Sequence, residues 1–135
     1  MKKSFRGKLA DGAQERIRLS TNNGLIGYQI VKFQIIDANP ATGAPESVCK
    51  VYSSKPLDVS GAPISPDTTI DFTDPTLLAS AFLKHGSTNT TYDSEIIIFD
   101  NMKFNQDIFI THSDAADTVT MNYYLELEQV KLSKD

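Results

Sequence analysis

The segment from Lys3 to Ser20 has the sequence KSFRGKLADGAQERIRLS, in which apolar and polar residues alternate over two stretches, 3–9 and 14–20. An alternation with a period of two is typical of a β-strand that buries one face. Asp11-Gly12 lies between the two stretches and is a strong signal for a tight turn between paired strands. The segment therefore predicts a β-hairpin.

The same alternation continues along the rest of the chain, with turn residues about every ten positions. Six further strands are expected, at 27–37, 48–53, 68–72, 95–99, 107–111 and 119–132. The 27–37 strand carries apolar residues on both faces, so we expect it to lie centrally in a sheet. The 95–99 and 107–111 strands predict a second hairpin. The apolar phase changes between Leu127 and Val130, which predicts a β-bulge or a change of sheet.

A single helix is expected near 74–83. Asp74 can cap the free amides of a first helical turn, and Pro75 suits the first helical position. An apolar stripe follows with helical spacing. Together with the strands, this helix predicts an all-β fold: an eight-stranded antiparallel β-sandwich, jelly-roll-like, with one short helix. At 135 residues, the chain is expected to form a single β-sandwich domain, 1–135.

The segment 54–67 contains three prolines and cannot supply a regular ladder of amide donors. It is expected to be an ordered loop or arm. Two interpretations stay open: an ordinary surface crossover between the sheets, or an arm that lies across a neighbouring subunit.

The net charge is −4, but the basic residues gather at the start of the chain. Residues 1–18 hold six basic and two acidic residues, a net +4, while the other 117 hold seven basic and fifteen acidic residues, a net −8. The candidate contact residues are Lys2, Lys3, Arg6 and Lys8. They predict contact with an acidic neighbour or with nucleic acid. The alternative is a solvated edge strand that lysines protect from stray pairing.

Metal chemistry has little support in the sequence. His85 and His112 are the only histidines, and neither has a partner at zinc-ligand spacing. Four aspartates surround the second predicted hairpin: Asp100, Asp107, Asp114 and Asp117. They are expected to be turn residues, although a calcium ion between loops stays open. Cys49, the single cysteine, is expected to be a small buried apolar residue. No metal and no cofactor are expected.

Catalytic and nucleotide-binding motifs are absent from the sequence. There is no Gly-x-Ser-x-Gly elbow and no glycine-rich phosphate-binding pattern. An enzyme would need His112 in a cleft, together with a serine or with two carboxylates. We therefore expect no catalytic residue and no small-molecule substrate.

Nothing in the sequence indicates membrane contact. The basic residues near Met1 have no long apolar stretch behind them, and the longest apolar run is Ile96–Phe99. We therefore expect synthesis in the cytoplasm.

Six segments spread over most of the chain carry a resemblance: 5–9 (FRGKL), 14–20 (QERIRLS), 24–30 (GLIGYQI), 99–101 (FDN), 105–109 (NQDIF) and 122–128 (NYYLELE). Together they resemble small virion structural proteins of marine viruses and phages. The resemblance implies a β-sandwich or single jelly roll in a virion, as a coat, decoration or minor capsid protein without catalysis. The implied partners are other copies of the chain, other capsid proteins and, through the basic strand, nucleic acid. No functional residue is carried over from the family.

A ligand-binding module, for example one for carbohydrate, is the alternative. Such sites usually present exposed flat aromatic rings, and this chain has no tryptophan and five tyrosines. Tyr52 and Tyr92 lie near predicted loops and are the candidates. Both are also typical amphipathic residues at the boundary of a core.

Overall fold

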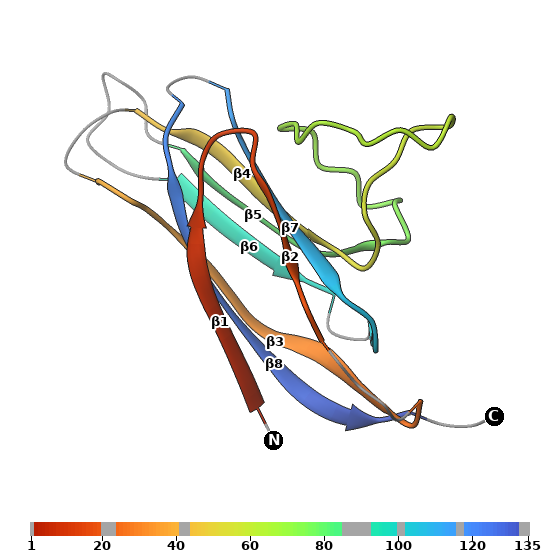
Figure 1. Ribbon diagram of the computed structural model, residues 1–135. Coiled ribbons are helices and arrows are strands. Elements are labelled where there is room, and N and C mark those ends of the chain that lie inside the picture. The colour runs from red at the N-terminus through yellow and green to blue at the C-terminus, as the bar shows by residue number, and fades with distance from the viewer. Residues whose placement is uncertain are drawn as a thin grey trace.

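The computed structural model describes residues 2–19, 24–40, 44–84, 93–99, 102–115 and 118–132, which form eight β-strands and no helix. The strands are β1 (Lys2–Leu9), β2 (Gln14–Ile17), β3 (Ile26–Asp37), β4 (Glu46–Tyr52), β5 (Leu77–Lys84), β6 (Asp93–Ile98), β7 (Ile108–Asp114) and β8 (Met121–Lys131). They form a three-stranded sheet, β1-β8-β3, and a five-stranded sheet, β2-β7-β4-β5-β6, both antiparallel (Figure 1). The predicted all-β class with eight antiparallel strands is confirmed.

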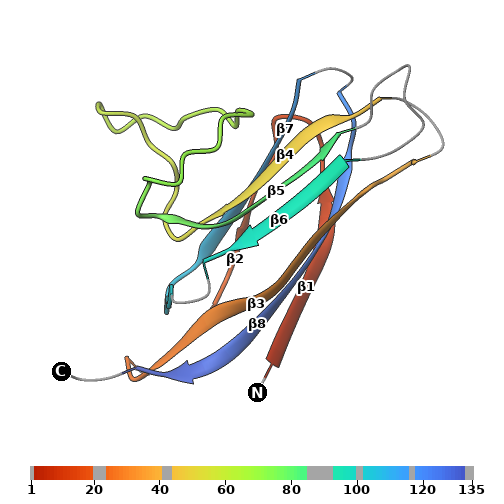
Figure 2. The ribbon, with the colours of Figure 1, turned by 180° about the vertical axis from the view of Figure 1, so that it is seen from behind.

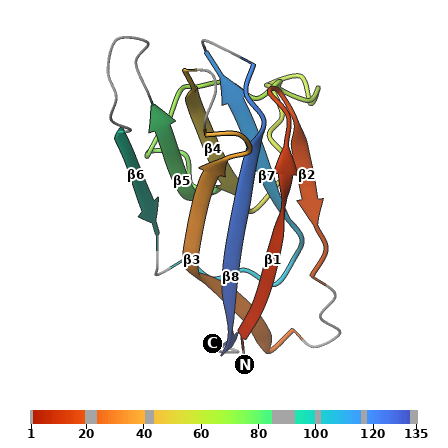
Figure 3. The same ribbon diagram turned by 90° about the vertical axis from the view of Figure 1, so that its left-hand side faces the viewer.

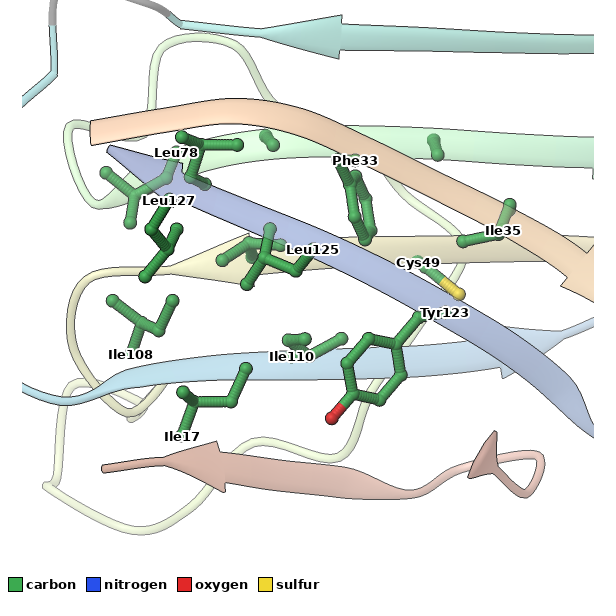
Figure 4. Close-up of a cluster of buried hydrophobic side chains, with 14 of the residues drawn as sticks. Ile17, Phe33, Ile35, Cys49, Leu78, Ile108, Ile110, Tyr123, Leu125 and Leu127 are labelled. Carbon is green, nitrogen blue, oxygen red and sulfur yellow. The ribbon is translucent and has the colours of Figure 1, made fainter. Parts of the chain in front are cut away.

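The two sheets share one hydrophobic core. In β8 alternate residues are buried from Met121 to Leu127, because successive side chains of a strand point to opposite faces. Figure 4 shows Phe33 and Leu125 of one sheet pointing toward Ile110 of the other. Cys49 is fully buried in this core, as expected. Burial of each large apolar side chain contributes about 1.5–3 kcal/mol, so this core is the main force that holds the sheets together.

Neither predicted hairpin forms. β1 pairs with β8 and β2 pairs with β7, so the turn at Asp11-Gly12 carries the chain from one sheet to the other (Figure 1). Gly12 has a φ of +80°, as such a turn requires, and its amide donates to the carbonyl of His112. The strands of the second predicted hairpin, 95–99 and 107–111, correspond to β6 and β7. β6 pairs with β5, while β7 pairs with β2 and β4. A turn signal reverses the chain but does not determine which strand becomes the partner.

The helix expected near 74–83 is wrong, since Leu77–Lys84 is strand β5 between β4 and β6. The Asp74 carboxylate accepts hydrogen bonds from the amide and hydroxyl of Thr76, which closes a tight turn before the strand. β5 is buried along most of its length, and a short continuous apolar run cannot be distinguished from a buried helix by periodicity. The strand expected at 68–72 is also wrong, because these residues form no ladder.

β3 is not central; it lies at an edge of its sheet, and β8 is in the middle (Figure 3). The register of β3 against β8 shifts between Ile30 and Lys32, so the bulge lies in β3, opposite Glu126 and Leu127 and just before the Leu127–Val130 segment of β8 where it was expected. The extra residue changes the phase, so that Ile30 and Phe33 both point into the core. The outer face of β3 stays exposed, as Ile36 shows.

Residues 53–76, called the arm below, connect β4 to β5, which are neighbours in one sheet. The arm is therefore not the crossover between sheets that one interpretation expected. It stands off the five-stranded sheet on the side away from β1 (Figures 1 and 2).

Candidate interaction surfaces

The basic strand divides its cations between two faces of the three-stranded sheet. The predicted contact residues all lie on β1: Lys2, Lys3, Arg6 and Lys8. Lys2, Arg6 and Lys8 alternate on the outer face, and the Nζ of Lys2 lies 3.7 Å from Oε1 of Glu126. Lys3 points to the other side, where its Nζ lies 5.3 Å from the ring centre of Tyr28. The structure therefore brings only part of the set to one surface, where Arg6 and Lys8 are neighbours and both exposed.

Arg6 and Lys8 border a shallow hollow of about 470 Å³ on this outer face. Tyr124 of β8 lines it, with Arg6 of β1 and Gln34 of β3 as its direct cross-strand neighbours. Lys32 reaches over the tyrosine ring, with Nζ 5.9 Å from the ring centre. Sequence reasoning missed Tyr124. The in-and-out alternation of Tyr123 and Tyr124 along the predicted strand is the signal that could have found it.

The arm is fastened to the outer face of the five-stranded sheet by Lys50. Its side chain is only 5% exposed, and Nζ donates to Oδ1 of Asp67 at 2.8 Å and to the carbonyl of Thr69 at 2.6 Å. Lys50 also lies 5.8 Å from the ring centre of Tyr52, the candidate aromatic residue. The other candidate, Tyr92, lies outside the described residues. A lysine held in this way ties the arm to β4.

A cavity of about 570 Å³ lies between the arm and the sheet. Lys50, Tyr52 and Thr111 line it from the sheet, and Asp67, Asp71 and other arm residues line it from above. The Thr111 hydroxyl is buried without a hydrogen-bond partner among the described residues. The cavity thus combines one aromatic ring with several polar groups.

The tip of the arm is an ordered turn with apolar residues facing water. Oδ1 of Asp58 accepts hydrogen bonds from the hydroxyl and amide of Ser60 and from the amide of Ala62, and these bonds lower the pKa of the carboxyl. Four large apolar side chains of the arm are nevertheless exposed: Leu57, Val59, Ile64 and Phe72. Val59 is fully exposed. Exposed apolar residues mark an interaction surface where they form one contiguous patch, so the arm is a candidate surface.

Strand β6 is a second exposed apolar element. It pairs with β5 on one side only, and both Ile96 and Ile97 are 40% exposed. An edge strand of this kind offers unpaired backbone groups to another chain.

The structure brings a serine, a histidine and an aspartate together, but in a buried structural arrangement. Nε2 of His112 lies 3.0 Å from Oγ of Ser47, which donates to Oδ2 of Asp114 at 2.6 Å. Nδ1 of His112 faces the carbonyl of Leu9, whereas in a catalytic triad a carboxylate orients that nitrogen. His112 and Ser47 are 0% and 1% exposed, so their side chains are closed off from solvent. Its contacts join the β1–β2 turn to β4 and β7.

The acidic residues near β7 do not converge. Asp107 precedes β7 and binds Nε of Arg16 and the amide of Leu19, and these hydrogen bonds, the amide first, lower the pKa of its carboxyl. Asp114 lies at the opposite end of the strand. Asp100, Asp117 and His85 lie outside the described residues. In the part of the chain that the structure describes, no group of three His, Cys, Asp or Glu residues could hold a metal ion.

Neither the known family models nor the curated protein sequences contain a match to this chain. Within the described ranges, no helix is long and apolar enough to cross a membrane.

Proposed function

We propose that this chain is a virion structural protein of a virus or bacteriophage, a coat, decoration or minor capsid subunit that acts by self-assembly or by binding to a capsid, without catalysis. The observation that carries the proposal is the arm, an ordered segment that projects from a sheet and presents four apolar side chains to water. In the isolated chain these side chains are between 43% and 109% exposed, so they obtain at most part of the about 1.5–3 kcal/mol that full burial of each would contribute. A neighbouring copy that covers the arm would bury the rest of this apolar surface.

We further propose that the fold is a jelly roll. In a jelly roll an antiparallel ribbon of eight strands wraps around the core, so that the first strand pairs with the eighth, the second with the seventh and the fourth with the fifth. β1–β8, β2–β7 and β4–β5 are paired in this way. The remaining pair, β3 and β6, lie in contact without a ladder. The jelly roll is common in viral capsid proteins, which supports the proposal by analogy of fold.

The anchor at Lys50 supports an assembly role for the arm. A segment without regular hydrogen bonding loses conformational entropy when it docks on a neighbour. Here the contacts of Lys50 with Asp67 and Thr69 and the turn at Asp58 already order the arm. A preorganised arm therefore binds a neighbour at lower entropic cost.

The test compares the unmodified chain with Val59→Asp by size-exclusion chromatography with light scattering, followed by negative-stain microscopy. We expect oligomers or shell-like particles from the unmodified chain and a shift to monomer in the variant, since Val59 is fully exposed and its replacement leaves the core intact. Ile36→Glu is the matched control, because Ile36 is exposed on the other sheet. Equal assembly of Val59→Asp and the unmodified chain would refute the role of the arm.

The cavity beneath the arm favours one alternative, a β-sandwich ligand-binding module. It places Tyr52 beside Lys50, Thr111 and the arm carboxylates, a mixture of aromatic and polar groups that suits a sugar. Binding on a glycan array that Tyr52→Ala abolishes, by a chain that stays monomeric, would favour this alternative over the capsid role.

A further inference from the structure

We propose that the outer face of the three-stranded sheet binds single-stranded nucleic acid around Tyr124. The tyrosine ring stacks on a base, while Arg6, Lys8 and Lys32 contact the flanking phosphates. The predicted basic strand supplies only two of these four residues, and β3 and β8 supply the others.

Charge is the first argument. The whole chain has a net charge of −4, yet the hollow at Tyr124 is bordered by Arg6 and Lys8 and by no carboxylate. Glu126 follows Tyr124 on this face of β8, but it lies opposite Lys32, and its Oε1 is 3.7 Å from Nζ of Lys2, so two lysines offset its charge. A polyanion therefore meets a positive surface at Tyr124 despite the acidic chain.

The shape and polarity of the hollow are the second argument. Tyr124 has a cation over its ring, at 5.9 Å, and Ile36 beside it on β3 is 62% exposed. The flat apolar floor suits a base, and the amides of Gln34 and Asn122 at its border can bond to the edges of a base. An aromatic platform with a basic border is how proteins hold single strands without reading their sequence.

The geometry favours a single strand over a duplex. Stacking on Tyr124 needs an unpaired base, and the described residues offer no helix for a major groove. The hollow of about 470 Å³ on an open sheet face is also shallow enough for a strand to pass across it.

This site does not depend on self-assembly. A chain that stays monomeric and binds the strand refutes the proposed assembly and leaves the site intact. A chain that assembles but does not bind the strand refutes the site alone.

The test measures fluorescence anisotropy of a labelled oligothymidylate of about 12 nucleotides, a length within the usual range for such sites. We expect Tyr124→Ala to weaken binding about 10-fold, as loss of one stacked base predicts. The slope of log K against log salt should be about −2, or 0.7 for each of three phosphate contacts. Arg6→Gln should reduce this slope by about 0.7 and Tyr124→Ala should leave it unchanged.

Three controls keep the proposal falsifiable. Lys103→Gln removes an exposed lysine that does not line the hollow and should bind like the unmodified chain. Ile36→Glu alters only an exposed side chain, so it should fold normally and lose binding. Inorganic polyphosphate, which has charge but no bases, should compete poorly. The proposal would be overturned if polyphosphate competed as well as unlabelled oligothymidylate, or if the duplex of the oligothymidylate with its complement bound as tightly as the single strand. Unchanged binding by Ile36→Glu would also overturn it.

Discussion

The contact between Lys50 and Asp67 leads to an asymmetric prediction: removal of the exposed carboxylate should destabilise the protein more than removal of the buried lysine. Lys50 is 5% exposed, whereas the side chain of Asp67 is 59% exposed. Asp67→Ala leaves the ammonium group in a nearly dry position with the Thr69 carbonyl as its hydrogen-bond partner. Lys50→Met removes the charge and keeps a chain of similar length, and Asp67 keeps its contact with water and its hydrogen bond from the Thr69 amide.

The magnitudes follow from the contacts. Asp67→Ala removes the hydrogen bond from Lys50, for which about 1.5–3 kcal/mol is usual, and a longer one from the exposed Thr69 amide. Water in the neighbouring cavity can replace part of both, so the variant should cost about 2 kcal/mol. Lys50→Met loses two hydrogen bonds but also the desolvation cost of the ammonium, and should change stability by less than about 1 kcal/mol. The double variant should be no less stable than Asp67→Ala.

Urea denaturation followed by far-ultraviolet circular dichroism measures these values. Asp71→Ala is the matched control, because Asp71 closes a similar turn with Thr73 and has no lysine partner. Lys50→Met, alone or combined with Asp67→Ala, should also make the arm more sensitive to chymotrypsin, which cleaves after exposed residues such as Phe72. A larger loss for Lys50→Met than for Asp67→Ala would refute the reasoning.

Three further predictions concern the core and the charged groups. Burial raises the pKa of Cys49 to about 12, whereas the unfolded thiol ionises near 9.0, so stability should fall as the pH rises above that value. A thiol reagent should label only the unfolded chain, and rapid labelling under native conditions would contradict the burial. The pKa of Asp107 lies below its usual 3.8, so its contribution is present above that pH and is lost as the pH falls through the folded value. The urea midpoint of the unmodified chain should therefore fall as the pH is lowered, and it should fall less for Asp107→Asn. An equal fall in both proteins would show that the contacts of Asp107 with Arg16 and Leu19 do not stabilise the fold. Phe33→Ala should cost about 3–5 kcal/mol in urea denaturation, and a loss below about 1 kcal/mol would show that Phe33 is not packed between the sheets.

Local patterns predicted the strands well, because a strand with one buried face alternates whatever its partner is. The alternation gave β1, β3 and β8 nearly to the residue. Pairing depends on contacts far apart in the chain, so the Asp11-Gly12 turn was assigned to a hairpin although its strands join different sheets. The helix prediction for Leu77–Lys84 was wrong for another reason: both faces of this strand are covered, so its residues do not alternate between apolar and polar.

The candidate surfaces, like the strands, were predictable only where they depend on local sequence. The prolines of 54–67 predicted an ordered loop or arm, and the basic composition of the first strand predicted Lys2, Lys3, Arg6 and Lys8 as contact residues. Lys32 and Tyr124 join them only because β3 and β1 flank β8, which no local pattern reveals. The anchor at Lys50 was also not predicted, since a lysine in an apolar strand has no sequence signal for a partner in the arm.

Self-assembly is measured by sedimentation velocity of the unmodified chain over a wide concentration range. We expect species heavier than the 14.9 kDa chain, which grow with concentration and appear as closed oligomers or shell-like particles by negative stain. A single species with the mass of one chain at every soluble concentration would contradict self-assembly through the arm.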